Sequence, residues 1–276
     1  MLGDDQKNVL MLLAAHFHGL PFTKTVNNPH GQFRLFLSGA AGTGKSKLIE
    51  CIKFYTFMLY GYDYTPHGPV LIAASTGIAA IGINGSTADT LFRLRQYDGG
   101  PISDEFRRTL QNELGRAKLL ILDEISMTGC TKIGKIDKLM RIATIKYDQF
   151  MGGVHYIICG DHLQLPPVKD SCIYKNPINS DNCNELKVSG YELYANTFLY
   201  YKLKQVFRQK DNKFTKSLSR ARVCQATEED AKMWNTRLFP SVECAEILNL
   251  PNDTMFVAST HATCDEGNRM EVNIRK

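Results

Sequence analysis

The sequence predicts an α/β fold, built on a parallel sheet with helices on both of its faces. Two observations lead to this prediction. Short runs of consecutive aliphatic residues recur along the chain, and unbroken runs of this kind are typical of strands buried on both faces. Segments with apolar residues at helical spacing separate these runs, which is the alternation that crossovers between parallel strands require.

The expected elements follow one another in regular order. Buried strands are predicted at 33–37, 70–74, 119–122 and 154–159, with a further strand at 254–258. Helices are predicted at 4–18, 45–60, 101–115, 131–147, 211–222, 228–238 and 261–272. Asp4 or Asp5 is the expected N-cap of the first helix. The polar segment 170–190 is expected to be a loop.

The composition is that of an ordinary globular protein: the 276 residues are 43% hydrophobic and 22% charged. The length suits one large domain, or one domain and part of another. No apolar run approaches the roughly 20 residues of a membrane span, and the N-terminus lacks a basic signal-peptide region. The eight cysteines include no CxxC pair, which argues against a zinc finger. We therefore expect an intracellular protein without a membrane partner.

A phosphate-binding pattern, GxxxxGK[ST], is matched by GAAGTGKS between a predicted strand and a predicted helix. The backbone N–H groups of its loop can surround phosphate oxygens at a helix N-terminus, and the loop consists of Gly39, Ala40, Ala41, Gly42, Thr43 and Gly44. Lys45 would reach the β- and γ-phosphates, and Ser46 would ligate Mg²⁺. The alternative is a glycine-rich turn with an exposed lysine.

Two acids follow the third predicted strand, in the segment LLILDE. Asp123 stands where the strand ends, at the edge of an open α/β sheet where ligands bind, and would hold the Mg²⁺ shell. Glu124 stands where a base could polarise the attacking water. The alternative is an acidic N-cap for the next helix.

The segment GDHLQLPPV follows the fourth predicted strand. Gln164 can donate to a γ-phosphate oxygen, and the two prolines after it stiffen the segment, so that a shift of Gln164 could be transmitted. The alternative is a proline-containing surface turn. His162 has no second histidine nearby, which favours a solvated loop histidine over a metal ligand.

The positive charge is concentrated in one stretch of the chain. The net charge is +5, yet residues 202–222 alone hold eight Lys or Arg and one acid. Such a stripe could face an anionic polymer, or it could be the solvated face of a helix.

Four segments together resemble superfamily-one helicases, and specifically the petite-integration-frequency (Pif) family. GAAGTGKS, LLILDEISM and GDHLQLPPV are similar to that family's first three motifs, and KLKQVFRQ at 202–209 is similar to the fourth. The helix at 131–147, the N-terminal residues 4–7 and the tail 258–268 also follow the family. The resemblance implies a RecA-like P-loop NTPase fold and an ATP-dependent DNA helicase that moves on single-stranded DNA with Mg²⁺ as cofactor. It further implies roles in DNA repair, recombination or telomere maintenance, in a nucleus or mitochondrion.

The resemblance also implies a role for each motif residue. Gln6 would read the adenine base, Asp123 would hold Mg²⁺ and Glu124 would be the base. Gln164 would couple the phosphate state to movement, and Arg208 would stabilise charge on the γ-phosphate. For Arg208 the alternative is simple membership of the basic stripe.

A further stretch resembles the family's DNA-contacting motifs. Ser75, Thr76, Gly77 and Thr87 could bind DNA phosphates through hydroxyls and backbone amides, and Phe92 could stack on a base. The alternative is a pair of helix-capping turns and core packing.

The chain departs from the family pattern in two ways. Asp89 stands where family members typically carry histidine, and an acid beside phosphates is unfavourable unless it is capped or points away. The family's last two motifs are not found after residue 209. We therefore expect an ATP-binding motor domain at 1–201 and the incomplete start of a second motor domain at 202–276. The rival interpretations are a nucleotide- or DNA-binding module without unwinding activity and, on weaker grounds, a P-loop kinase for a small molecule.

Overall fold

The computed structural model describes residues 2–20, 28–61, 66–178, 180, 182–197, 199–209 and 211–236, together with residues 262, 265 and 269. The chain forms two compact units, Met1–Thr215 and Lys216–Lys276. The first unit therefore extends beyond residue 201, where the sequence analysis places the domain boundary. The predicted strand at 254–258, most of the predicted helix at 261–272 and most of the tail at 258–268 lie outside the described residues.

The first unit contains a six-stranded sheet with the strand order β3-β2-β4-β5-β1-β6. All five pairings are parallel, which confirms the predicted fold class. The strands are β1 (Arg34–Gly39), β2 (Val70–Ala74), β3 (Ser86–Thr87), β4 (Leu119–Asp123), β5 (His155–Gly160) and β6 (Leu199–Leu203).

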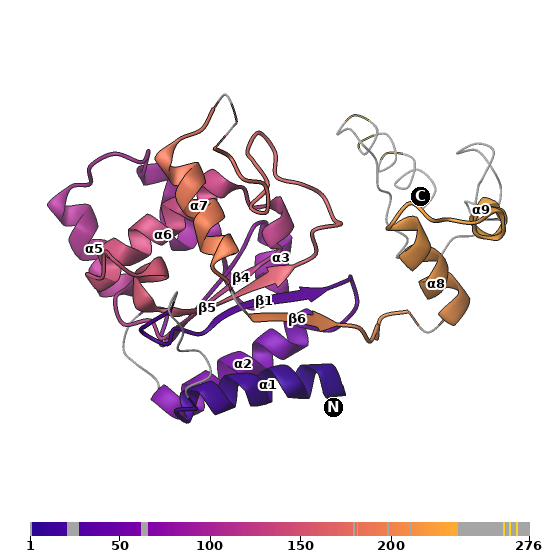
Figure 1. Cartoon of the computed structure of the whole chain (residues 1–276), viewed down its shortest axis with the longest axis horizontal. Coiled ribbons are helices and arrows are strands. Elements are labelled where there is room, and N and C mark those ends of the chain that lie inside the picture. The colour runs from indigo at the N-terminus through magenta and orange to yellow at the C-terminus, as the bar shows by residue number, and fades with distance from the viewer. Residues whose placement is uncertain are drawn as a thin grey trace. The chain divides into compact units, whose positions relative to one another are not determined.

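Helices cover both faces of this sheet. They are α1 (Asp4–Phe17), α2 (Lys45–Tyr60), α3 (Gly77–Gly82), α4 (Ala88–Leu91), α5 (Asp104–Leu114), α6 (Cys130–Thr144) and α7 (Glu185–Ala195). Figure 1 shows α1 and α2 on one side of the sheet and α5, α6 and α7 on the other. None of the helices in the described ranges has both the length and the apolar character needed to cross a membrane.

Side chains that alternate along the strands divide the core in two. On β4, Leu119 and Ile121 pack with the residues of α1, α2 and α3, whereas Leu120 and Leu122 pack with those of α5, α6 and α7. All four of these side chains are at most 3% exposed. A strand that is buried on both faces needs an apolar residue at every position, which explains why the aliphatic runs predicted these strands so directly.

β6 and α7 were not predicted from the sequence. β6 is an edge strand with the sequence LYYKL, in which exposed and partly buried residues alternate, so it has no aliphatic run. The expected loop at 170–190 is wrong from Glu185 onward, because Asn184 caps α7 by accepting a hydrogen bond from the Lys187 N–H at 2.9 Å. Gly190 weakens the helical pattern, yet it lets α7 approach α6, because a Cβ there would collide with the carbonyl oxygen of Cys130.

The N-cap of α1 is also different from the prediction. Gly3 is the cap residue, and its N–H donates to Oε1 of Gln6 at 2.8 Å. Asp4 and Asp5 lie in the first turn instead, where acidic side chains are favourable because of the helix dipole.

The strand register aligns the ends of the strands. Ser38 of β1 pairs with Gly160 of β5, and Gly39 pairs with Leu203 of β6. Asp123, the last residue of β4, pairs with Ala74, the last residue of β2. The segments that follow these strands therefore start from the same edge of the sheet, where open α/β proteins bind ligands.

Along the chain, α8 (Asn212–Ala221) begins in the last residues of the first unit and ends in the second, where α9 (Glu228–Asn235) follows. Arg220 forms a two-point ion pair with Asp230, with Nε donating to Oδ2 at 2.7 Å and Nη2 donating to Oδ1. This pairing lowers the pKa of Asp230. Trp234 Nε1 donates to Ser217 Oγ at 3.2 Å.

Candidate nucleotide site and DNA-binding patch

The phosphate loop connects β1 to α2, as its sequence predicts. Gly42 and Gly44 adopt φ values of +81° and +78°, which glycine tolerates without strain. Lys45 is 8% exposed, and its Nζ donates to the carbonyl oxygens of Gly39 at 2.7 Å and Ala40 at 3.3 Å. The ammonium group is therefore held against the loop that the pattern assigns to phosphate.

The other loop residues divide into supporting and accessible ones. Thr43 is 2% exposed, and its Oγ1 donates to the Ala40 carbonyl oxygen at 2.9 Å, which closes the turn. Gly39 is buried, and a Cβ there would lie 2.6 Å from Thr43 Oγ1. Ala41 and Ser46 are exposed, so the Ser46 hydroxyl in the first turn of α2 is accessible to a ligand.

Asp123 ends β4 with its side chain 5% exposed. Burial raises the pKa of Asp123, and the neighbouring charge of Glu124 acts in the same direction, whereas a backbone hydrogen bond and Lys45 lower it. Its Oδ1 atom is buried and has no hydrogen-bond partner among the described residues. An unpartnered buried carboxylate oxygen is costly unless a cation or water completes it. Together with the hydroxyl of Ser46, this carboxylate fits the hard oxygen ligands that Mg²⁺ prefers.

The part of the chain that the structure describes holds no metal site built wholly from protein side chains. Within the described ranges, no group of three or more His, Cys, Asp or Glu side chains is placed to hold a metal ion. In NTPases, Mg²⁺ is usually held by one or two protein oxygens together with phosphates and waters, so such a cluster is not a requirement for Mg²⁺ binding.

Glu124 has an unusual backbone conformation. Its φ is +53°, and a short 3₁₀ helix, Ile125–Met127, follows it at once. Left-handed backbone is uncommon for residues other than glycine and often marks a functional position. The side chain is partly exposed, so it is accessible from the sheet edge on which Asp123 lies.

The segment after β5 begins with a buried anchor. Asp161 is 2% exposed, and its Oδ1 accepts the Leu163 N–H at 3.1 Å. Gln164 is exposed, and its Nε2 lies 3.5 Å from Asp161 Oδ2, so the amide is only weakly held. The exposed amide of Gln164 is therefore accessible to a ligand at this edge.

His162 is not the solvated loop histidine that the sequence suggests. Its ring stacks on Phe36 with centroids 4.8 Å apart, and its Nε2 lies 2.8 Å from the hydroxyl of Tyr194. Burial lowers the pKa of His162. The sequence did not predict this aromatic cluster, because Phe36 and Tyr194 come from distant parts of the chain.

The segment after β6 returns to the phosphate loop. The Phe207 N–H donates to the Gly42 carbonyl oxygen at 2.8 Å, and a Cβ on Gly42 would lie 2.7 Å from Cβ of Arg208. The structure thus brings Arg208, which is exposed, next to the loop that the sequence assigns to phosphates. Phe207, which the sequence analysis did not select, is 46% exposed, and its ring lies 3.6 Å from a Cβ placed on Gly44.

Gln6 joins α1 to the same loop. Its Nε2 donates to the carbonyl oxygens of Gly44 at 3.0 Å and Thr43 at 3.4 Å, while its Oε1 accepts the Gly3 N–H. The side chain is 4% exposed. The amide NH₂ group is thus engaged by the backbone of the phosphate loop, and adenine recognition by Gln6 stays a prediction.

A polar pocket of about 440 Å³ lies at the ends of β2 and β3, and two of the five residues selected for DNA contact, Ser75 and Thr87, line it. The pocket is lined by Ser75, Thr87, Asp89, Thr90, Arg93, Arg95 and Gln96. The Ser75 hydroxyl is buried without a hydrogen-bond partner in the described part of the chain.

Thr76 and Thr87 cap short helices. Oγ1 of Thr76 accepts the N–H of Ala79 at 3.3 Å, and Oγ1 of Thr87 accepts the N–H of Thr90 at 3.2 Å. Gly77 is exposed.

Phe92 does not belong to this pocket. It is 0% exposed and packs in the core with α5 and α6, so the prediction that it stacks on a DNA base is wrong. The local sequence does not distinguish these two environments, because an aromatic residue that follows a polar turn can face either a ligand or the core. Asp89, by contrast, is capped as the sequence analysis required, because Lys132 Nζ lies 2.8 Å from its Oδ2.

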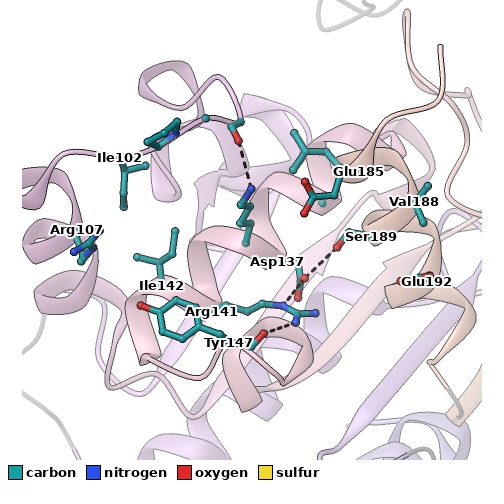
Figure 2. A pocket seen from close by; sticks show the side chains of 16 residues that line it. Ile102, Arg107, Asp137, Arg141, Ile142, Tyr147, Glu185, Val188, Ser189 and Glu192 are labelled. Carbon is teal, nitrogen blue, oxygen red and sulfur yellow. Dashed lines mark hydrogen bonds and ion pairs between the residues drawn. The ribbon is translucent and has the colours of Figure 1, made fainter.

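A larger cavity, of about 920 Å³, lies elsewhere, between α5, α6 and α7. Figure 2 shows Ile102 and Arg107 on one side of it and Glu185 and Glu192 on the other. At its floor, Asp137 accepts hydrogen bonds from Arg141 Nε at 2.8 Å and from the Met151 N–H and Ser189 Oγ. The buried carboxylate is fully partnered and no predicted site residue lines the cavity, so we assign it to the packing of α7 on α6.

Comparison with known proteins agrees with this geometry. The family model for PIF1-like helicases matches residues 2–232. The ATP-dependent DNA helicase RRM3 of Saccharomyces cerevisiae is 32% identical over 213 residues, which is 72% of this chain and 26% of that protein. The helicase PIF1 of the same species is 31% identical over 256 residues, which is 90% of this chain and again 26% of that protein. The chain thus spans about a quarter of the length of these curated relatives.

Solved structures agree in fold. The Pif1 helicase of Candida albicans superposes with a TM-score of 0.70 at 25% identity, covering 99% of this chain and 54% of that one. The Bacteroides Pif1 in complex with ADP-AlF3 and ssDNA superposes with a TM-score of 0.69 at 21% identity, covering 100% and 58%. The six-stranded parallel sheet, the phosphate loop between β1 and α2, and a family match over most of the sequence all lead to one assignment. This chain belongs to the PIF1-like helicase family.

Proposed function

We propose that this chain is the ATP-binding motor region of an ATP-dependent DNA helicase, which hydrolyses ATP with Mg²⁺ and moves on single-stranded DNA. One observation carries the proposal. The phosphate loop, the Asp123–Glu124 pair, the Gln164 segment and the Arg208 segment follow four different strands, and the register of the sheet places all four at one edge. Such an edge is where α/β proteins bind nucleotides.

Each residue of the site has a proposed role in phosphoryl transfer. Lys45 leaves the carbonyl oxygens that hold it and pairs with the β- and γ-phosphates, since phosphate is a far stronger partner for an ammonium group. Glu124 accepts a proton from the attacking water, and Gln164 donates to the γ-phosphate. Arg208, which lies against Gly42, stabilises the charge that develops on the γ-phosphate.

Mg²⁺ would bind between Ser46 and Asp123, where it supplies charge neutralisation for the phosphates. The unpartnered Oδ1 of Asp123 supports this role. The raised pKa of Asp123 is consistent with a carboxylate whose burial becomes favourable once a cation is present.

We also assign a role to Phe207, which was not among the residues selected from the sequence. Its half-exposed ring lies beside Gly44 and Gly3, at the junction between the phosphate loop and α1. A flat aromatic face in this position suits stacking on the nucleotide base, and Gln6 lies beside the same two glycines.

The polar pocket beside β2 and β3 is proposed as part of the path of single-stranded DNA. Hydroxyl groups and arginines are the usual partners of phosphodiester oxygens, and both are present there: Thr87, Thr90, Arg93 and Arg95. Among solved relatives, the Bacteroides protein was crystallised with ssDNA. By resemblance, the process served is DNA repair, recombination or telomere maintenance, in a nucleus or mitochondrion.

The deciding experiment is an ATPase assay of this chain with and without oligothymidylate, in the presence and absence of Mg²⁺. We expect turnover that requires Mg²⁺ and increases with single-stranded DNA, and that is lost in Lys45→Ala. Turnover without any response to DNA would overturn the proposed coupling and would favour a small-molecule kinase. A strand-displacement assay then shows whether this length of chain unwinds a duplex or only binds.

A further inference from the structure

Lys132 stands next to the polar pocket although no motif includes it. It lies in the first turn of α6, and its Nζ is 2.8 Å from Oδ2 of Asp89, which lines the pocket. The side chains of Lys132 and Asp89 are 31% and 37% exposed, so water has access to both partners. An ion pair of this exposure contributes little stability, and the ammonium can change partners at small cost.

The charges around the pocket are largely cancelled within the protein. Arg93 forms a two-point pair with Glu113, with Nε donating to Oε2 at 3.1 Å and Nη2 donating to Oε1 at 2.6 Å. Asp89 is the single acid among the residues that line the pocket, and Lys132 neutralises it. Arg95 is exposed and adds a positive charge. The pocket therefore has the residue types of a phosphate site but only a small net positive charge.

Three hydroxyl groups line the same pocket. Thr87 and Thr90 lie with their Oγ1 atoms 2.9 Å apart, and the Ser75 Oγ is buried without a hydrogen-bond partner in the described residues. A buried hydroxyl without a partner is unfavourable, and an incoming phosphate oxygen would satisfy it. The unpartnered Ser75 hydroxyl is an observation that does not depend on the charges, and it favours a ligand that is an oxygen-rich anion.

We propose that Lys132 is a DNA-phosphate-binding residue, which Asp89 holds in the free protein and which transfers to a phosphate when single-stranded DNA enters the pocket. Asp89 then acts as a built-in limit on affinity, because it competes for Lys132 and repels the phosphate. This proposal rests on the proposed binding of single-stranded DNA. It names Lys132 and Asp89 as two residues that set the affinity for the strand.

The test measures binding of a fluorescent oligothymidylate by anisotropy at several salt concentrations. Lys132→Met removes the charge but keeps the aliphatic stem, and Asp89→Asn removes the competing acid. The matched controls are Lys138→Met on the same helix, whose Nζ lies 3.4 Å from the Gly99 carbonyl oxygen, and Asp104→Asn, an exposed acid at the start of α5. Lys132→Arg retains the charge, and thermal unfolding of each variant checks the fold.

We expect Lys132→Met to reduce the steepness of log K against log salt by about 0.7, the value of one phosphate contact on a single strand. Asp89→Asn should bind about three- to tenfold more tightly at low salt, with the difference vanishing at high salt. Lys132→Met should cost more in the Asp89→Asn background than alone, because the ammonium is then fully available to DNA. Lys132→Arg should keep the wild-type slope.

Two results would overturn the inference while leaving the proposed function intact. One is a salt slope for Lys132→Met equal to that of Lys138→Met. The other is an affinity of Asp89→Asn no higher than that of Asp104→Asn, which would show that the pair only ties α4 to α6. Absence of any binding by the unaltered protein would instead overturn the proposed function, and this inference with it.

Discussion

The amide nitrogen Nε2 of Gln6 lies 3.0 Å from the carbonyl oxygen of Gly44, so that α1 is bonded directly to the last residue of the phosphate loop. The same nitrogen reaches the Thr43 carbonyl oxygen, and Oε1 accepts the Gly3 N–H. Gln6 is separated from this loop by almost forty positions in the sequence, yet it determines how the loop backbone is held.

This bond leads to a prediction about base selectivity. We expect Gln6→Ala to weaken binding of ATP and of GTP by the same factor, about tenfold, since buried hydrogen bonds to the loop backbone serve both nucleotides. Asn8→Ala, an amide on the same helix that donates to Tyr201, is the control and should leave both affinities unchanged. Fluorescent nucleotide titrations measure the effect. A loss confined to ATP would show instead that Gln6 reads adenine.

Lys45 and Glu124 should separate binding from turnover. Lys45→Ala should abolish ATP binding, whereas Glu124→Gln should bind ATP and turn it over at least about a hundredfold more slowly, because the general base is lost. Lys47→Ala and Glu50→Gln are matched controls, since these two residues pair with each other on the exposed face of α2. Normal turnover in Glu124→Gln would refute the assignment of the base.

Gly42 and Gly61 form a natural comparison. Both have positive φ, +81° and +73°, but a Cβ on Gly42 would meet Arg208, whereas a Cβ on Gly61 would meet nothing within 4 Å. Both alanine variants bear the backbone strain of about 1–2 kcal/mol. Only Gly42→Ala should displace the Arg208 segment and reduce ATP turnover. Equal turnover in the two variants would show that this contact does not affect catalysis.

Phe92 should behave as a core residue. Because its side chain is fully buried, Phe92→Ala should lower the free energy of unfolding by about 3–5 kcal/mol. Phe92→Leu should be milder and should bind single-stranded DNA as the unaltered protein does. Denaturant unfolding and anisotropy test the two effects separately. Reduced DNA affinity in Phe92→Leu with unchanged stability would restore the stacking role that the sequence suggests.

The lowered pKa of His155 predicts how the free energy of unfolding depends on pH. Its Nδ1 accepts the Phe33 N–H at 3.0 Å, and burial lowers its pKa from 6.5 to about 3, with the charge of His16 acting in the same direction. Between these values the unfolded chain binds a proton that the folded protein excludes. The free energy of unfolding should therefore be insensitive to this group above pH 7 and fall by up to about 1.4 kcal/mol per pH unit below 6.5.

The comparison for this prediction is between His155→Gln and His30→Gln, since His30 is exposed. Thermal unfolding between neutral and acidic pH should show a shallower decline for His155→Gln, whose side-chain oxygen can still accept the Phe33 N–H. Identical declines in the two variants would contradict a partly buried His155 that is neutral in the folded protein.

Prediction from the sequence succeeded best where a local pattern has a single structural explanation. Leu119–Leu122 is apolar at every position, and only a strand with both faces covered uses such a run. GAAGTGKS needs its glycines for positive φ and its lysine for phosphate, so pattern and chemistry coincide. β6 has neither property, because an edge strand exposes half of its residues and has no unbroken apolar run.

By itself, then, the sequence determined the fold class, the four inner strands and the motif residues at their ends, because these depend on local pattern and strand alternation. The tertiary structure alone decided that Phe92 is in the core, that His162 joins an aromatic cluster, that Gln6 holds the phosphate loop and that Lys132 covers Asp89. Each of these depends on which distant side chain occupies a neighbouring position. These contacts are decided by the packing of helices on the sheet. The packing energy depends on residues that are far apart in the sequence, so it cannot be read from a short segment.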